Sequence, residues 1–423
     1  MSTNFLARDQ KSVWHPFDIF QNVENIFIER SKGINLYTSD GRNIKDMVSS
    51  WWTNLHGHNH PHIVSAIQRQ AEVLSHAIFS GFTHEPAIRL AERLLEILPN
   101  KMEKIFYSDN GSTAVEVGLK IAIQHWHNLG DKKTKILAFE GCYHGDTFGA
   151  MSLAGPEPFN QPFAPHLFQV TYLPFPNAVN WQQVENILQT ELSTGQYAAI
   201  VYEPMIQGVG GMRLFDCNLQ DSVLDTCKKN NVLLVADEVM TGFGRTGKLF
   251  ASEYLKTKPD IVCMSKGITG GFLPLGATAI TQNVYKVFVS SDKKKLFLHG
   301  HSYTGNPLAC AAANASLDLL LNVFCMQQLQ AISTWQASFA ESLRGHSSLE
   351  WANSLGTILT INLVPKEKQG YFDSRAEQAY KFFIDRNLLL RPMGNVVYLS
   401  PPYCATENDM SEAYDAILAY LEK

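Results

Sequence analysis

The sequence predicts an α/β fold built around a mostly parallel sheet. Two short apolar runs without polar alternation, residues 231–236 and 261–264, are typical of strands that are buried on both faces. A carboxylate, Asp237, follows the first run, and an amine, Lys266, closely follows the second. The carboxyl ends of parallel strands are where α/β enzymes place their active sites. We therefore expect Asp237 and Lys266 to belong to one site.

The composition is that of an ordinary globular protein with small-molecule partners. The 423 residues are 45% hydrophobic and 18% charged, enough for two or three structural units. The net charge of −5, without a basic block, argues against nucleic acids and anionic membranes as partners. We expect neither a signal peptide nor a membrane span. The seven cysteines are scattered without C-x-x-C pairs, which indicates reduced thiols and a cytoplasmic location.

Residues 1–60 mix aromatic side chains with turns, and the phrase SSWWTNLHGHNHP (49–61) stands out. Its Trp51 and Trp52 could be core residues. Between serine, glycine and histidine, however, they are better placed to line a pocket. We therefore expect this phrase to contribute to a binding site.

Four histidines in and after this phrase alternate along the chain, at positions 56, 58, 60 and 62. In a strand they would share one face and suggest a metal site. Gly57 and Pro61 interrupt any such strand, and no cysteine or carboxylate lies nearby in the sequence. We therefore expect no metal site here.

A possible anion site follows a helical stretch at residues 63–98 and a short strand at 104–108. In SDNGSTAVEVGLKIA, Asn110 and Gly111 form a turn, and Ser112 and Thr113 are expected to cap a helix. Free backbone amides and hydroxyls converge there, as they do where helices bind anions. An ordinary capped helix explains this segment equally well.

Two further predicted strands end beside residues of chemical interest. KILAFE (135–140) leads into GCYHGDTFGAMS, where glycines flank Tyr143 and His144 and let the backbone pass close to a ligand. An aromatic ring at that point can stack on a flat heterocycle. AAIVYEP ends on Glu203, a position that fits a residue supporting a site.

The glycines of GFGRTG spell the dinucleotide fingerprint G-x-G-x-x-G at positions 242, 244 and 247. That fingerprint joins a strand directly to a helix. Here four residues follow Asp237 before the first glycine, and no helical stripe follows the last. The sequence therefore argues against a dinucleotide site.

Burial determines which charge states Asp237 and Lys266 favour. An amine beside apolar strands is pushed towards its neutral, nucleophilic form, and a buried carboxylate needs a cationic partner. By spacing alone, a structural ion pair would explain both residues at least as well. Pyridoxal phosphate (PLP) also satisfies both, because its aldehyde binds a lysine and its ring nitrogen takes an acidic partner.

The phrases DEVMTGFGRTGKLFA and PDIVCMSKGITGGFLPLGA resemble the signature of the class III aminotransferases. The resemblance implies a type I PLP-dependent aminotransferase fold, with a large domain at 61–318 around a mostly parallel sheet. A small α+β domain would be built from both termini, 1–60 and 319–423. The resemblance also implies a homodimer in which each subunit reaches the cofactor phosphate of the other.

The same resemblance assigns roles at the cofactor. Lys266 would bind PLP covalently and move the proton, Asp237 would face the ring nitrogen, and Tyr143 would cover one face of the ring. Gly111 and Ser112 would bind the phosphate, and Ser302 would reach the phosphate of the partner subunit. The remaining expected cofactor neighbours are His144, Glu203 and His301.

Five sequence motifs restrict the resemblance to one group within the family: WHPF, SSWWTNLHGHNHP, YHGDTFGAMS, GFGRTGKLFA and LRPMGNVVYLSPPY. They are similar to members of the family that move an amino group from S-adenosylmethionine to 8-amino-7-oxononanoate, giving 7,8-diaminononanoate for biotin. Arg391 would then bind the carboxylate of the oxononanoate, as a planar guanidinium suits. A surface ion pair is the other interpretation. The remaining expected substrate contacts are Phe17, Trp51, Trp52, Tyr143, Gly300 and Tyr398.

Two departures from the family pattern stand out. Phe17 replaces the usual tyrosine and removes a hydroxyl, and His301-Ser302-Tyr303-Thr304 replaces Pro-Thr-Phe-Met but keeps a hydroxyl at Ser302. Other activities stay open: lysine as the amino donor, or a class III aminotransferase acting on ornithine, β-alanine or diamines. A nicotinamide dehydrogenase or a histidine-dependent metal binder is the alternative from another class.

Overall fold

The computed structural model describes residues 5–17, 25–155, 160–365, 373 and 375–423. The chain divides into two compact units. One comprises Pro61–Met326, and the other combines Met1–His60 with Gln327–Lys423. Each unit has its own sheets and its own apolar core.

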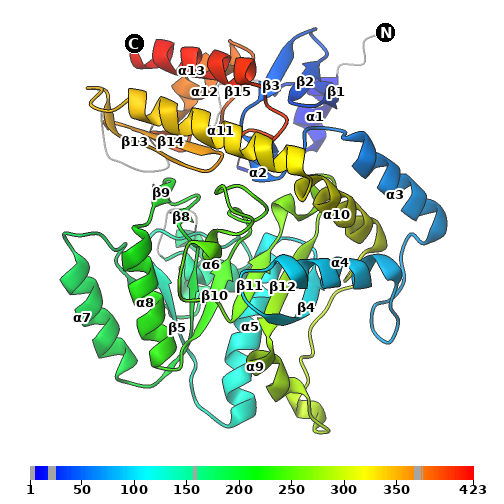
Figure 1. The fold of residues 1–423 in the computed structure, drawn as a ribbon, viewed down its shortest axis with the longest axis vertical. Helices are drawn as coiled ribbons and strands as arrows, with labels where there is room; N and C mark the ends of the chain where they lie inside the picture. Colours follow the sequence, from blue (N-terminus) through cyan, green and yellow to red (C-terminus); the bar gives the residue numbers. More distant parts are fainter. Residues whose placement is uncertain (1–4, 18–24, 156–159, 366–372, 374) are drawn as a thin grey trace. The chain divides into compact units, whose positions relative to one another are not determined.

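The unit Pro61–Met326 is built on a seven-stranded sheet with the order β4-β12-β11-β10-β7-β5-β6 (Figure 1). Strands β5, β6, β7, β10 and β11 are parallel neighbours, whereas β12 is antiparallel to both β11 and β4. The strands span Met102–Ser108 (β4), Lys135–Phe139 (β5), Thr171–Leu173 (β6), Tyr197–Tyr202 (β7), Leu233–Asp237 (β10), Ile261–Met264 (β11) and Gly276–Thr281 (β12). The expectation of a mostly parallel sheet is confirmed.

Helices and short elements complete this unit. The helices are α3 (Pro61–Val73), α4 (Glu85–Ile97), α5 (Gly111–Leu129), α6 (Phe148–Leu153), α7 (Trp181–Leu192), α8 (Cys217–Lys229), α9 (Gln282–Tyr285) and α10 (Pro307–Leu320). Two-residue strands β8 (Ile206–Gln207) and β9 (Arg213–Leu214) pair with each other. Helix α5 packs closely on the sheet, because a Cβ added at Gly118 would lie 2.8 Å from the Cys263 sulfur of β11. Val115 and Ala122 of α5 share a core with Val235 and Ile261.

The other unit joins the two ends of the chain in one sheet. Its four strands are ordered β1 (Ile28–Lys32), β2 (Asn35–Thr38), β3 (Asn43–Asp46) and β15 (Leu388–Leu389), with β15 parallel to β3. A second sheet has the order β13 (Leu349–Leu355), β14 (Ile358–Leu363), β16 (Val396–Leu399). The helices are α1 (Phe5–Ser12), most of α11 (Val323–Ser342), α12 (Arg375–Ile384) and α13 (Glu407–Leu421). The short element α2 (Ser49–Trp52) is a single turn with positive φ values. Met47, Leu359, Phe383 and Ile417 lie in its core.

Several element boundaries differ from those expected. The stretch 63–98 is two helices, α3 and α4, and not one. The N-cap of α5 is Asn110, whose side chain accepts the backbone N–H of Thr113, so Ser112 is not the cap. In the described part of the chain, no single helix is long and apolar enough to cross a membrane. By length and composition alone, the bent pair α10 and α11 meets that test.

Candidate functional site

Asp237 and Lys266 leave neighbouring parallel strands at the same edge of the sheet. Asp237 is the last residue of β10 and lies opposite Cys263 of β11 in the parallel register (Figure 1). Lys266 comes three residues after Cys263, at the start of the 3₁₀ turn Lys266–Thr269. The strand pattern alone predicted this arrangement, because short buried runs of this kind pair in parallel.

The surroundings of Lys266 lower the pKa of its amine, which favours the neutral, nucleophilic form. Burial lowers its pKa from 10.5 to about 8, with Arg245 adding to the effect and the negative charges of Asp237 and Glu203 opposing it. An amine of that pKa is neutral in about a tenth of the molecules at pH 7, whereas an ordinary lysine is almost fully charged. The site therefore supplies a reactive amine without an added base.

His144 fixes the Asp237 carboxylate. Its Nδ1 donates to Asp237 Oδ2 at 2.7 Å, and the backbone N–H of Val239 donates to Oδ1 at 3.0 Å. Burial by itself would lower the pKa of His144, but the adjacent Cys142 and Asp237 raise it well above its ordinary value. The short hydrogen bond therefore holds the imidazole and the Asp237 carboxylate together as a buried pair.

Glu203, the residue after β7, holds the Tyr143 segment. Its carboxylate accepts the backbone N–H of Gly208 at 2.8 Å and that of Tyr143 at 3.4 Å. Burial raises the pKa of Glu203 to about 7; His144 opposes this effect and Asp237 adds to it. Glu203 thus connects the Tyr143 segment to the sheet edge that carries Asp237 and Lys266.

The start of α5 lies against the Tyr143–Asp146 loop. Ser112 Oγ accepts the backbone N–H of Asp146 at 3.1 Å. Gly145 has a φ of 130°, and a Cβ there would lie 2.0 Å from Ser112 Oγ, so only glycine fits. A Cβ at Gly111 would likewise lie 2.7 Å from the Val239 side chain, two residues after Asp237. The start of α5 is therefore packed against the segment that follows Asp237, and the backbone amides of a helix start suit an anionic ligand.

Glu238 is an anchor that reasoning from sequence missed. Its fully buried carboxylate accepts four hydrogen bonds, from the Thr241 hydroxyl, the Ala251 amide, and the amide and hydroxyl of Ser252, at 2.6 to 3.1 Å. It ties the glycine-rich loop back to the end of β10. No helix opens after these glycines, only the short 3₁₀ turn Ala251–Glu253, which agrees with rejecting a dinucleotide fingerprint.

The segment before α10 forms a compact polar turn. The backbone N–H of His301 donates to Thr304 Oγ1 at 3.1 Å, and that of Tyr303 donates to His301 Nδ1 at 3.2 Å. Gly300, Ser302 and Tyr303 are exposed, with Tyr303 at 65%. Ser302, whose hydroxyl is expected to bind an anion, is therefore accessible on the surface of the chain.

The unit built from both ends of the chain, 1–60 and 327–423, is called the terminal unit here. In it, Phe17, Trp51 and Arg391 form one cluster. The Arg391 guanidinium carbon lies 4.8 Å from the centroid of the Trp51 ring, and Arg391 Nη2 donates to the Phe17 carbonyl at 3.1 Å. The rings of Phe17 and Trp51 meet edge to face at 5.4 Å. Stacking on an aromatic face leaves the planar fork of an arginine oriented for a carboxylate.

Two other expected substrate residues lie deeper in the same unit. Trp52 and Tyr398 are 3% and 1% exposed, and their rings are tilted with centroids 6.0 Å apart. They pack beneath the surface, so their predicted contact with substrate stays a prediction. The alternating histidines do not share a strand face: His58 donates to Asp46, and His62 on α3 pairs with Asp318.

Comparison with known proteins shows what this chain resembles. The aminotransferase class-III family model matches residues 19–421. The adenosylmethionine-8-amino-7-oxononanoate aminotransferase of Synechococcus elongatus is 44% identical over 422 residues, covering 97% of this chain and 98% of the relative. The protein of the same name from Helicobacter pylori is 33% identical, covering 99% and 98%.

Solved structures of aminotransferases superpose on this chain over almost its full length. The crystal structure of adenosylmethionine-8-amino-7-oxononanoate aminotransferase from Methanocaldococcus jannaschii superposes with a TM-score of 0.93 at 33% identity, covering 99% of this chain and 98% of that one. An amine transaminase from an uncultivated Pseudomonas species, in its PLP-bound form, gives 0.89 at 28% identity, with 97% and 98% covered.

Proposed function

This chain belongs to the class-III aminotransferase family, and from that membership we propose that it moves an amino group from S-adenosylmethionine to 8-amino-7-oxononanoate. The product would be 7,8-diaminononanoate, an intermediate of biotin biosynthesis. The observation that carries the chemistry is the pair Asp237 and Lys266 at one edge of the sheet. The choice of substrates is supported by full-length similarity to relatives of that name.

The residues at this edge fit PLP as the cofactor. Lys266 offers an amine whose pKa is lowered to about 8, and Asp237 offers a carboxylate held by the buried His144. The start of α5, with Gly111 and Ser112, offers amides and a hydroxyl for a phosphate. When bound, PLP supplies a ring that accepts electrons from the carbon that loses its proton.

Each residue then has a role that follows from its position. Lys266 would hold the cofactor through its amine and would move the proton to and from the reacting carbon. Asp237 would face the ring nitrogen and favour its protonated form. His144 holds Asp237 in place, and Glu203 holds the Tyr143 segment. Tyr143 would cover one face of the ring. Donor and acceptor would use these groups in turn, which gives ping-pong kinetics.

Recognition of the acceptor is assigned to the terminal unit. Arg391, stacked on Trp51 and bonded to the Phe17 carbonyl, would bind the carboxylate of 8-amino-7-oxononanoate. Trp52 and Tyr398 of the same unit are further proposed contacts of the substrate. On this assignment the unit Pro61–Met326 is the large PLP-binding domain and the terminal unit is the small domain.

We also propose that the enzyme acts as a homodimer in the cytoplasm. Ser302 is exposed, in a polar turn with His301, and would reach the cofactor phosphate of the partner subunit. Cys142, Cys217, Cys227, Cys263, Cys310 and Cys404 are free thiols, which suits a reducing compartment.

A donor screen tests this function. Purified protein is incubated with 8-amino-7-oxononanoate and, separately, S-adenosylmethionine, lysine, ornithine or β-alanine, and 7,8-diaminononanoate is measured by mass spectrometry. We expect product with S-adenosylmethionine. Product with lysine alone would revise the donor, and absence of product with every donor would reject the acceptor.

A further inference from the structure

A left-handed turn carries the tryptophan that contacts Arg391. Four consecutive non-glycine residues have positive φ: Ser49 at 51°, Ser50 at 47°, Trp51 at 74° and Trp52 at 72°. Residues with a Cβ rarely adopt this conformation even singly, because the Cβ approaches the following carbonyl oxygen. Such a run persists only where surrounding groups hold it.

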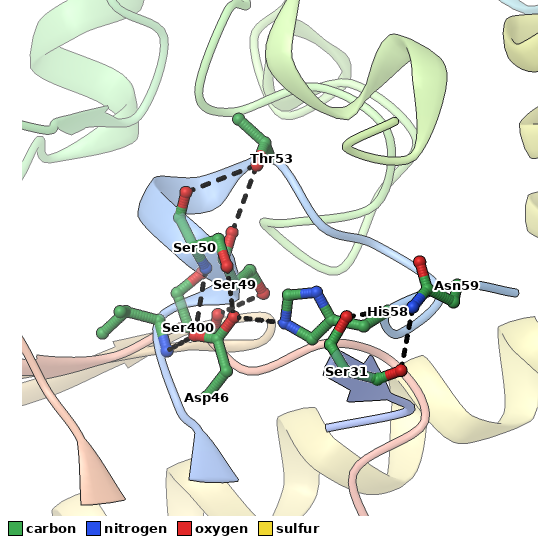
Figure 2. Close-up of polar contacts among 9 residues, drawn as sticks. Ser31, Asp46, Ser49, Ser50, Thr53, His58, Asn59 and Ser400 are labelled. Carbon is green, nitrogen blue, oxygen red and sulfur yellow. Dashed lines mark hydrogen bonds and ion pairs between the residues drawn. The ribbon is translucent and has the colours of Figure 1, made fainter. Parts of the chain in front are cut away.

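The Asp46 carboxylate is the group that holds this turn (Figure 2). Asp46 is fully buried, and its Oδ1 accepts the backbone N–H groups of Val48 at 3.2 Å and Ser50 at 3.0 Å. Its Oδ2 accepts the Ser50 hydroxyl at 2.7 Å. One side chain therefore satisfies three donors at the start of the turn. The Ser49 hydroxyl adds a bond to the Ser400 carbonyl at 2.7 Å.

His58 completes the shell of the carboxylate, and its own position is fixed by the first hairpin. His58 Nε2 donates to Asp46 Oδ2 at 3.0 Å. The backbones of His58 and Gly33 exchange two hydrogen bonds. Asn59 donates to the Ser31 carbonyl at 2.8 Å (Figure 2). A buried carboxylate with four donors is restrained on all sides, which is what a device for fixing a strained turn requires.

The turn determines where Trp51 lies, and Trp51 in turn contacts Arg391 and Phe17. The guanidinium stacks on the indole, and the ring of Phe17 meets the same indole edge to face. If the turn relaxed to ordinary negative φ values, the Trp51 ring would leave this cluster. The guanidinium would then lose the surface that orients it.

We propose that Asp46, supported by His58, is a positioning residue that sets the affinity for the carboxylate-bearing amino acceptor. It acts through the left-handed turn by holding Trp51 against Arg391. The inference rests on the proposed function, since it assumes that Arg391 binds the acceptor carboxylate. It assigns no catalytic step to Asp46.

Three variants of the complete enzyme with bound cofactor test this. Asp46→Ala removes all four bonds, Asp46→Asn keeps an oxygen for the two backbone donors, and Asp40→Ala is the control, an exposed carboxylate in the same unit. We expect Asp46→Ala to raise the KM for 8-amino-7-oxononanoate about tenfold or more, with kcat and the donor half-reaction changed less than about threefold. Asp46→Asn should recover most of the affinity, and the control should match wild type.

A crystal structure of Asp46→Ala gives a second readout that does not depend on activity. We expect residues 49–52 to leave the left-handed region and Trp51 to leave Arg391. An unchanged turn would overturn the inference, and so would an equal loss in both half-reactions, because that pattern marks general damage. If Asp46→Ala does not fold, His58→Ala takes its place in both measurements, with an expected rise in KM of about threefold.

The two hypotheses fail in different ways. If wild type and Asp40→Ala both form no 7,8-diaminononanoate, the proposed function is rejected. The structure of Asp46→Ala then still decides whether Asp46 holds the turn. If wild type is active and Asp46→Ala keeps the wild-type KM, the positioning role is rejected and the proposed function stands.

Discussion

Lys266 should destabilise the cofactor-free protein at neutral pH, because the fold holds its amine in a site that disfavours the charge. Replacing Lys266 with Met keeps the length of the side chain and removes the ionisable group. Lys266 has a φ of 44°, and Met shares its Cβ, so backbone strain does not change. We therefore expect Lys266→Met to be more stable than wild type when PLP is absent.

The size of this effect follows from the pKa of Lys266. The difference between 10.5 and about 8 corresponds to about 3.4 kcal/mol, at about 1.36 kcal/mol per pKa unit. The side chain is partly accessible, so water screens part of the cost, and we expect a gain of about 2 kcal/mol. The unfolded chain holds the proton to higher pH than the folded one. The gain is therefore complete below pH 8, shrinks between about 8 and 10.5, and vanishes above that range.

Urea unfolding of the cofactor-free proteins at a series of pH values measures this. The matched control is Lys294→Met, at an exposed lysine, which should stay within about 0.5 kcal/mol of wild type. If Lys266→Met were no more stable than wild type at pH 7, Lys266 would not be the desolvated amine described above. A gain that did not decrease with rising pH would refute the electrostatic explanation.

Two further predictions concern residues around the site. Glu238→Ala leaves buried donors of Thr241, Ala251 and Ser252 without their acceptor, so the free energy of unfolding should fall by roughly 3 to 5 kcal/mol. Urea titration measures this, and a loss below about 1 kcal/mol would show that the loop is held by other contacts. Phe17→Tyr adds one neutral hydroxyl, worth about 0.5 to 1.5 kcal/mol, so the KM for 8-amino-7-oxononanoate should fall by less than roughly tenfold. Progress curves with S-adenosylmethionine and lysine would reveal a switch of donor, which would contradict a role limited to that acceptor.

The sequence predicted those parts of the site that depend on local burial. Uninterrupted apolar runs identified β10 and β11; Asp237 is the last residue of β10, and Lys266 comes two residues after the end of β11. Glu203 follows β7 in the same way. These predictions are confirmed because buried parallel strands leave a pattern within a few consecutive residues.

The sequence did not predict the features that depend on distant partners. The segment SSWW contains no glycine, so nothing in it predicts a left-handed turn. The turn is held by the Asp46 carboxylate, which is itself held by His58, twelve positions further along the chain. The strand β15 pairs with β3 from the other end of the chain, which no local pattern encodes. The roles assigned to individual residues, and the domain boundary expected at residue 318, stay predictions.

Lys266 is proposed to bind the cofactor covalently and to move the proton during the reaction. The most direct measurement is borohydride reduction of the PLP-loaded protein, followed by peptide mapping and by a parallel assay of Lys266→Ala. We expect the reduced cofactor to remain attached to Lys266 alone, and the variant to have no turnover with S-adenosylmethionine and 8-amino-7-oxononanoate. A label on another lysine, or near-normal turnover in Lys266→Ala, would contradict the account.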